Sequence, residues 1–259
     1  MTELAKLTWT EVEKRLEEGC AAILPVGSTE AHGPHLPLDT DVTIACGMAR
    51  RAAERLEIAG QPCVVLPAVS YSVTEFAQGF PGSMSVRPET ARAHLADILR
   101  AAVATGFAPI AVANGHLEPA HIQSIVGAIE DVVAETQAQV LFPDVTRRRN
   151  AERLTAEFQS GACHAGSYES SLVMADDPDA VKDDVRRELP EVDISLVDVI
   201  RAGQTDFVEA GGTQAYFGQP AEASVDEGHA TYEVLAALLV EAIEAATAAT
   251  DDSSEPSSP

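Results

Sequence analysis

A chain of 259 residues is long enough for one large domain with a substantial core, whereas two domains of this total length would each be short. Its 41 acidic residues against 17 basic ones give a net charge of -24, and a field of that sign repels phosphate, which argues against nucleic acid as a partner. Hydrophobic residues make up 46% of the chain, so the acidity indicates a carboxylate-covered surface and not disorder.

Such a surface, with lysine found only at Lys6, Lys14 and Lys182, predicts a cytoplasmic protein from a high-salt organism, in which salt screens the repulsion between carboxylates. An acidic protein of an ordinary organism is the alternative. The widely spaced cysteines predict buried thiols in a reducing compartment. They are Cys20, Cys46, Cys63 and Cys163. The sequence has no signal-peptide core and no apolar run of membrane-spanning length, so we expect no membrane association.

Strands and helices alternate along the first part of the chain. Residues 7–19 predict a short helix with a capping box formed by Thr10 and Glu13. A buried strand at 20–26 is followed by a polar loop at 27–41. The helical spacing of small and apolar residues then predicts a helix at 42–59.

The same unit recurs, with a loop after each strand. Further strands are predicted at 62–69, 108–113 and 138–142, and further helices at 89–105 and 120–136. Because continuous apolar strands alternate with helices, we expect an α/β fold: a single-domain, three-layer α/β/α structure with a mainly parallel sheet and helices on both faces. We expect this domain to cover residues 1–250.

The second half of the chain is less regular. An arginine triplet at 147–149 predicts a helix start or a contact between subunits, with the helix continuing to 159. A glycine-rich turn at 161–166 opens an apolar helix, and the polar segment 176–190 is expected at the surface. A long helix at 226–247 should close the core with one apolar face. That face comprises Tyr232, Leu235, Leu238 and Leu239. The acidic tail at 251–259 is predicted to be disordered.

The loop at 27–41 concentrates ionisable side chains directly after a buried strand. They are Glu30, His32, His35, Asp39 and Asp41. Prolines and glycines exclude regular structure here, so the backbone can aim several polar groups at one point. Imidazole and carboxylate together suit a borderline divalent cation such as zinc, manganese or iron. The alternative is a solvated polar loop.

A second polar loop follows the strand at 108–113 and contains Asn114, His116 and Glu118. In a parallel sheet, both loops leave at the carboxyl edge and converge there. The convergence of two imidazole-bearing and carboxylate-bearing loops favours a metal site. His94, His121 and His229 fall on helical patterns and are expected to be ordinary surface or core histidines.

Three motifs in this order resemble those of the creatininase (creatinine amidohydrolase) family. They are Gly-Ser-Thr-Glu-Ala-His-Gly-Pro-His-Leu-Pro-Leu-Asp-Thr-Asp at 27–41, Asn-Gly-His-Leu-Glu at 114–118 and His-Ala-Gly-Ser-Tyr-Glu-Ser-Ser at 164–171. The likeness runs from Trp9 to the last helix. It implies a Rossmann-like α/β fold, two divalent metal ions per subunit, hydrolysis of a carbon-nitrogen amide bond in a small-molecule substrate, and a homohexamer.

The resemblance also implies roles for individual residues. Glu30, Asp41 and His116 would bind one ion, often manganese. His32, Asp41 and Glu118 would bind a second, typically zinc, so that Asp41 bridges. His164, Glu118 and Glu169 are the candidate catalytic residues, with His164 passing a proton to the leaving nitrogen and Glu169 orienting it or a ligand. His35, Asp39 and Asn114 would orient ligands or brace the loops.

Each residue also has a simpler interpretation. Glu30 and His32 could be loop surface, Asp41 a helix cap, His116 a partner of a backbone carbonyl, and Glu169 a first-turn acid that interacts with the helix dipole. We favour the metal site because all of them occur together and in this order.

The substrate signals conflict. Creatinine-hydrolysing relatives resemble one another in tryptophans that close over a flat ring, yet the only tryptophan here is Trp9. Glu118, in contrast, resembles the His-x-Glu of creatininase itself. A rival function is a formamide hydrolase acting on a pyrimidine intermediate of flavin or deazaflavin synthesis, which would need Arg87, Arg147 or Arg148 at the pocket to bind phosphate. A non-catalytic, metal-stabilised structural protein is the alternative of another class.

Overall fold

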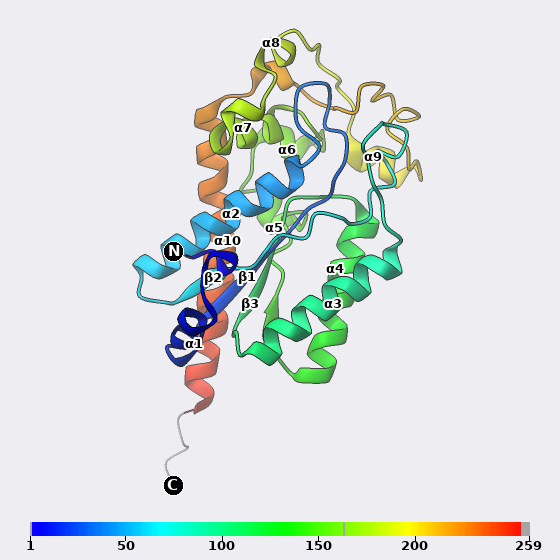
Figure 1. Cartoon of the computed structure of the whole chain (residues 1–259). Coiled ribbons are helices and arrows are strands. Elements are labelled where there is room, and N and C mark those ends of the chain that lie inside the picture. The colour runs from blue at the N-terminus through cyan, green and yellow to red at the C-terminus, as the bar shows by residue number, and fades with distance from the viewer. Residues whose placement is uncertain (1, 163, 255–259) are drawn as a thin grey trace.

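The computed structural model describes residues 2–162 and 164–254, and its centre is a four-stranded parallel sheet in the order β2-β1-β3-β4 (Figure 1). The strands are β1 (Ala21–Val26), β2 (Cys63–Val65), β3 (Ile110–Asn114) and β4 (Val140–Leu141). Every residue of β1 and β3 is buried, as expected for strands covered on both faces. The predicted parallel sheet is therefore confirmed.

Helices cover both faces of this sheet. The longer ones are α1 (Trp9–Glu17), α2 (Thr40–Ile58), α3 (Pro88–Thr105), α4 (Pro119–Thr136), α7 (Ser167–Asp176) and α10 (Val225–Ser254). The shorter ones are α5 (Arg148–Ala151), α6 (Ala156–Ser160), α8 (Asp183–Arg186) and α9 (Leu196–Arg201). Within the described part of the chain, no helix is long and apolar enough to cross a membrane.

The two hydrophobic layers follow from the alternation of side chains along β1. Ala21 and Ile23 pack with α2, α7 and α10. Ala22 and Leu24 point to the opposite face and pack with α3 and α4, which lie side by side in Figure 1. The result is the predicted three-layer α/β/α architecture, in which a fully buried leucine such as Leu24 contributes about 1.5–3 kcal/mol.

The last helix closes the core as predicted, because its apolar face is buried against α2 and α7. The face comprises Tyr232, Leu235, Leu238 and Leu239. The helix runs on to Ser254, into the segment predicted to be a disordered tail. The remainder of that tail, 255–259, lies outside the described residues.

Three local predictions were wrong. The capping box of α1 is formed by Thr8 and Glu11, earlier in the chain than expected. The helix predicted up to residue 159 is interrupted, because the Thr155 side chain accepts a hydrogen bond from the Phe158 N–H and begins a new helix. Arg186 lies in the segment expected at the surface, yet it is buried and donates to backbone carbonyls of residues 220 and 221.

The cysteines within the described residues are free thiols, as predicted. Cys20 and Cys63 are buried, and Cys46 is half-buried. Cys163 lies outside the described residues.

The carboxyl ends of β1 and β3 bring the two polar loops together. Val26 pairs with Asn114, and the Gly115 N–H donates to the Val26 carbonyl at 3.0 Å. A Cβ atom on Gly115 would lie 2.1 Å from the Asp41 backbone oxygen, so only glycine allows this approach. The start of α2 and the loop after β3 are therefore in direct contact.

Candidate metal centre

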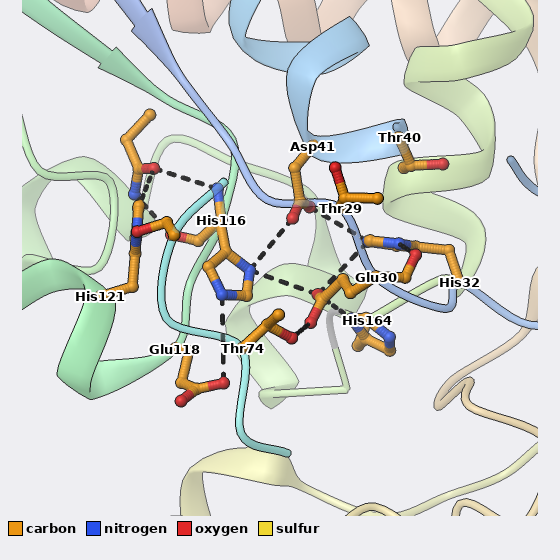
Figure 2. A network of polar contacts seen from close by, with 12 residues as sticks. Thr29, Glu30, His32, Thr40, Asp41, Thr74, His116, Glu118, His121 and His164 are labelled. Carbon is orange, nitrogen blue, oxygen red and sulfur yellow. Dashed lines mark hydrogen bonds and ion pairs between the residues drawn. The ribbon is translucent and has the colours of Figure 1, made fainter. Parts of the chain in front are cut away.

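The centre is built from the loops after β1 and β3 and from the first turn of α2 (Figure 2). The His116 Nδ1 atom lies 3.2 Å from Glu30 Oε1 and 3.1 Å from Asp41 Oδ2. The His32 Nε2 atom lies 3.0 Å from Asp41 Oδ1. All four side chains are buried. Glu30, Asp41 and His116, which the resemblance assigns to one ion, thus point at one another.

Asp41 belongs to two groups at once, because its two oxygens face different imidazoles. One group comprises Glu30, Asp41 and His116, and another comprises His32, Asp41 and Glu169. Glu169 reaches the cluster from α7, and its Oε2 atom lies 3.5 Å from His32 Nε2. Within each group the candidate ligand atoms lie within 4.8 Å of one another, which is close enough for one ion to contact all three.

Three of the atoms that face the middle of the cluster make no hydrogen bond to any residue that the structure describes. They are Glu30 Oε1, His32 Nε2 and Asp41 Oδ2. A buried polar atom without a partner is costly, and a buried charge is more so. A divalent cation that accepts nitrogen and oxygen ligands would satisfy these atoms together, so the residues fit a metal centre.

The electrostatics of the cluster depend on its buried carboxylates. Burial alone would favour the neutral imidazole, but Asp41 raises the pKa of His32 to about 10, and Glu30 holds the pKa of His116 well above its usual range. Burial raises the pKa of Glu169 to about 8. Metal binding at these residues would therefore displace protons, because ligands bind in their deprotonated forms.

Glu118 lies beside His116, on the side of its ring that faces away from Asp41. Its carboxylate accepts hydrogen bonds from the backbone N–H groups of Glu75 and Phe76, at 3.1 and 3.3 Å. It lies 4.0 Å from His116 Nε2, the ring nitrogen that faces away from Asp41. Among the described residues, Glu118 belongs to none of the candidate ligand groups. Glu169 stands beside His32 and Asp41 instead.

His164 lies at the edge of the cluster, with its ring 4.4 Å from that of His32. Its Nε2 donates to the Ala31 carbonyl at 3.0 Å, and its Nδ1 lies 3.7 Å from Glu30 Oε1. Burial, with the positive charge of His32 nearby, lowers the pKa of His164 to about 4. The ring is therefore neutral at pH 7 and presents an unprotonated Nδ1 to the cluster.

Asn114 braces the loop that carries His116. Its amide donates to the His116 carbonyl at 2.5 Å, and its oxygen accepts from the His116 N–H at 3.1 Å and from His121 Nε2 at 2.7 Å. His121 is a buried, hydrogen-bonded core histidine, as predicted. Thr74 donates to Glu30 Oε2 and fixes the second oxygen of that carboxylate.

The other two candidates for bracing the loops behave differently. His35 is buried, and its Nε2 contacts the Ser170 hydroxyl at 2.8 Å on α7. Asp39 is exposed at the N-cap of α2 and makes no side-chain capping hydrogen bond. The structure therefore brings His35 next to the centre but leaves Asp39 at the surface.

Sequence reasoning missed the residues that hold the turn between α6 and α7. Glu157 accepts from the backbone N–H groups of Tyr168 and Gln219, both at 2.8 Å. Cβ atoms on Gly166 or Gly218 would lie 2.3 Å from this carboxylate, so both glycines leave room for it. Glu157 and Gly218 are about sixty residues apart and form no local sequence motif, so no sequence signal indicated this contact.

A cavity of about 670 Å³ opens above the centre. Glu30, Asp41, Glu118, His164 and Glu169 contribute to its lining. Aromatic and aliphatic side chains from other segments complete its walls, among them Phe76, Phe158, Leu196, Ile200 and Phe207. The centre is therefore accessible to a ligand of moderate size.

An α/β sheet with a buried imidazole-carboxylate cluster at the carboxyl ends of its strands is an arrangement that can hold a divalent metal ion beside a ligand cavity. The chain belongs to the creatininase family, since the family model described as creatinine amidohydrolase matches residues 5–243. The resemblance in the sequence is thereby confirmed.

Its curated relatives differ in substrate. It is 30% identical to the mycofactocin precursor peptide peptidase of Mycobacterium tuberculosis, over 82% of this chain and 80% of that protein. The peptidase of the same name from Mycobacterium ulcerans is 31% identical, but the match spans only 60% of its length. The creatinine amidohydrolase of Pseudomonas putida is 31% identical over 44% of this chain and 45% of that protein.

Solved structures support the same fold. A crystal structure of creatinine amidohydrolase (creatininase) has a TM-score of 0.77 at 25% identity and covers 94% of this chain and 97% of its own. A structure described as "Creatininase Mn" has a TM-score of 0.72 at 25% identity, with 94% and 98% covered.

Proposed function

We propose that this protein is a dinuclear metal-dependent amidohydrolase whose substrate is a linear, peptide-like amide larger than creatinine. The observation that carries the proposal is the cavity of about 670 Å³, which has the ligand cluster at its floor and apolar walls. A volume in this range suits a ligand larger than one small ring. The M. tuberculosis relative named as a peptide peptidase supports the same direction.

One ion would be held by Glu30, Asp41 and His116, and the other by His32, Asp41 and Glu169. Asp41 would bridge, because its two oxygens face the two imidazoles. We assign Glu169 in place of Glu118 to the second ion, because Glu118 is held by backbone N–H groups outside both groups. The name of the manganese-containing relative supports manganese as one occupant.

When bound, two divalent ions supply a water molecule that ionises near neutral pH. Glu118 lines the cavity beside His116, and burial raises the pKa of its carboxyl group, which suits a group that takes a proton from the attacking water. His164 presents its unprotonated Nδ1 to the same cavity, where it would accept that proton from Glu118 and then donate it to the leaving nitrogen. Asn114 and Thr74 keep His116 and Glu30 in place.

Creatinine fits this cavity less well. The only tryptophan, Trp9, has 75% of its surface exposed and lines a separate hollow next to α3. The walls of the cavity are formed instead by Phe76, Phe207 and α9. No tryptophan is therefore available to close over a flat ring.

A formamide hydrolase acting on a phosphate-bearing pyrimidine is the second candidate. Arg147 lines the cavity, which meets the requirement for a cation near the site, whereas Arg87 pairs with Glu89 on α3. A purely structural metal protein is disfavoured, because such a protein would not need a cavity that opens onto the ligand cluster.

We further propose a cytoplasmic homo-oligomer, a hexamer by family resemblance, from a high-salt organism. The free thiols Cys20, Cys46 and Cys63 suit a reducing compartment, and the net charge of -24 suits high salt.

The test is an assay of metal-reconstituted protein in high salt against acetylated dipeptide amides, formamides, hydantoins and creatinine. We expect hydrolysis of the linear amides and little turnover of creatinine. Efficient creatinine hydrolysis with no cleavage of linear amides would contradict the proposed substrate class. A metal-loaded protein that hydrolyses none of these compounds would favour the structural alternative.

A further inference from the structure

The cavity above the metal centre changes in chemistry from its floor to its mouth. Its floor consists of buried carboxylates and imidazoles, and above them lie the buried rings of Phe76 and Phe207. Val197 and Ile200 of α9 continue the apolar wall and are partly exposed. Arg147 and Arg201 also line the cavity, and their side chains are 73% and 75% exposed, which places them on its solvent-facing side.

These two arginines are the only lysine or arginine side chains among the described residues that line the cavity. Each arginine forms a hydrogen-bonded ion pair with the aspartate three residues earlier in the chain. Arg147 Nε donates to Asp144 Oδ2 at 3.2 Å, and one terminal nitrogen of Arg201 donates to Asp198 Oδ1 at 3.2 Å. Each contact uses one side of the guanidinium fork and leaves further N–H groups that can bind an anion in a bidentate manner.

We propose that Arg147 and Arg201 select substrates that carry an anionic oxygen group, a carboxylate or a phosphate monoester, at the end remote from the scissile amide. The proposal rests on the proposed amidohydrolase function. The substrate would then place its amide at the floor, an apolar body against Phe76, Phe207 and α9, and its anion at the mouth. A short peptide with an apolar C-terminal residue and a free carboxylate has this order of groups.

The net negative charge of the protein makes local positive charge at the cavity necessary for an anionic substrate. With a net charge of -24, the field around the protein repels anions, so an anionic substrate needs local positive charge to approach the cavity. Arg147 and Arg201 reach the cavity from different segments, one at the start of α5 and the other at the end of α9. Planar guanidinium groups suit carboxylate and phosphate better than an ammonium group does.

Arg148 provides a matched control. It neighbours Arg147, is 92% exposed and pairs with Glu152, but it does not line the cavity. The variants Arg147→Gln, Arg201→Gln, the double variant and Arg148→Gln remove exposed charges only, so all four should fold.

The first measurement is calorimetry on the metal-loaded protein. It compares the affinity for an acetylated dipeptide with an apolar C-terminal residue in two forms, the free acid and the carboxamide. We expect the free acid to bind roughly five- to thirtyfold tighter, since the bonds are charge-assisted but screened by solvent. The double variant should lose this preference, Arg148→Gln should keep it, and rising salt should reduce it.

The second measurement compares hydrolysis of the same pair, and of a formamide with and without a phosphate monoester. Removing the arginines should raise KM for the anionic member with little change in kcat, as expected for lost uniform binding. Preference for the acid alone, or for the phosphate alone, identifies the natural source of the anion.

Equal affinity for acid and carboxamide would overturn the inference. So would a preference that survives in the double variant, because the carboxylate would then be binding the metal ions. If no compound is hydrolysed but the binding preference depends on Arg147 and Arg201, the amidohydrolase proposal fails and the anion site stands. If the amides are hydrolysed but the acid is not preferred over the carboxamide, the anion site fails and the amidohydrolase proposal stands.

Discussion

Asp41 is the side chain on which both ligand groups depend. Its Oδ2 faces His116 and its Oδ1 faces His32, and it is buried at the start of α2. Although burial raises the pKa of a carboxyl group, the neighbouring imidazoles hold the pKa of Asp41 well below its usual range. The lowered pKa favours the anionic form of Asp41, the form in which a carboxylate binds metal.

Replacing Asp41 with alanine should remove both ions together, because each ion loses a ligand. Glu169→Gln should release chiefly the second ion, and Glu118→Gln should retain both, because Glu118 lies outside the candidate ligand groups. Metal content per chain, measured after dialysis and during back-titration, distinguishes these outcomes. Two ions retained by Asp41→Ala would refute the bridge, and loss of the second ion from Glu118→Gln would restore Glu118 as its ligand.

His164→Ala should keep metal and fold but lower kcat by roughly a hundred- to ten-thousandfold, the usual loss when a general acid or base is removed. His164 belongs to a further candidate ligand group with Glu30 and His32, but its loss leaves the two groups that share Asp41 intact. His229→Ala on the exposed start of α10 is the control. A kcat within about threefold of the wild type would assign His164 a packing role only.

At the scale of elements, the site depends on how closely the loop after β3 approaches α2. The variant Gly115→Ala should destabilise the fold by about 1–3 kcal/mol or more and weaken binding of both ions, because its Cβ would lie 2.1 Å from the Asp41 carbonyl oxygen. Gly79→Ala is the control, since the nearest atom to its Cβ would be 3.9 Å away. Denaturant unfolding of the metal-free forms, followed by metal titration, checks both effects.

Equal stability of the two glycine variants would show that the loop can shift without cost. In that case the distance between His116 and Asp41 would not be set by Gly115, and the backbone contact would not be a determinant of the centre.

The sequence predicted the elements well where they are local and periodic. The alternation of apolar strands with helices led to the correct sheet, and α2, α3 and α4 begin and end within about two residues of their predicted bounds. The convergence of the loops after β1 and β3 also followed from parallel pairing alone. Glu30, Asp41 and His116 could therefore be placed together from the sequence alone.

The contacts that were missed join segments that are far apart in the chain. Glu169 was expected at the site from the resemblance, but its position beside His32 depends on the packing of α7 on α2, which the spacing of residues 164–171 does not indicate. Thr74 and Phe207 come from long irregular segments, whose course is set by packing and not by periodicity. Sequence motifs place residues at an edge of the sheet, but only packing decides which oxygen faces which nitrogen.

At the scale of the whole molecule, the dominant feature is the excess of carboxylates. Arginines form exposed pairs, such as Arg92 with Asp131, Arg100 with Glu135 and Arg153 with Glu241. Each such pair contributes at most about 1 kcal/mol in dilute salt. The net charge of -24 remains, so like charges repel across the surface and across any contact between subunits.

Salt should therefore stabilise the assembly more than the fold. Repulsion reaches roughly 30 Å at 0.01 M salt but only about 3 Å in molar salt, so on dilution an oligomer should dissociate before its secondary structure is lost. Light scattering and circular dichroism along a salt series separate the two steps, and saturating metal keeps ion loss from being mistaken for dissociation.

The fluorescence of Trp9, the only tryptophan and largely exposed, reports solvent changes at α1 in the same samples. An oligomer equally stable at about 0.05 M and 2 M salt would refute adaptation to high salt, because screening over that range shortens the repulsion several-fold. The metal centre would be unaffected by that result, since its groups are buried and close together, where salt screens them little.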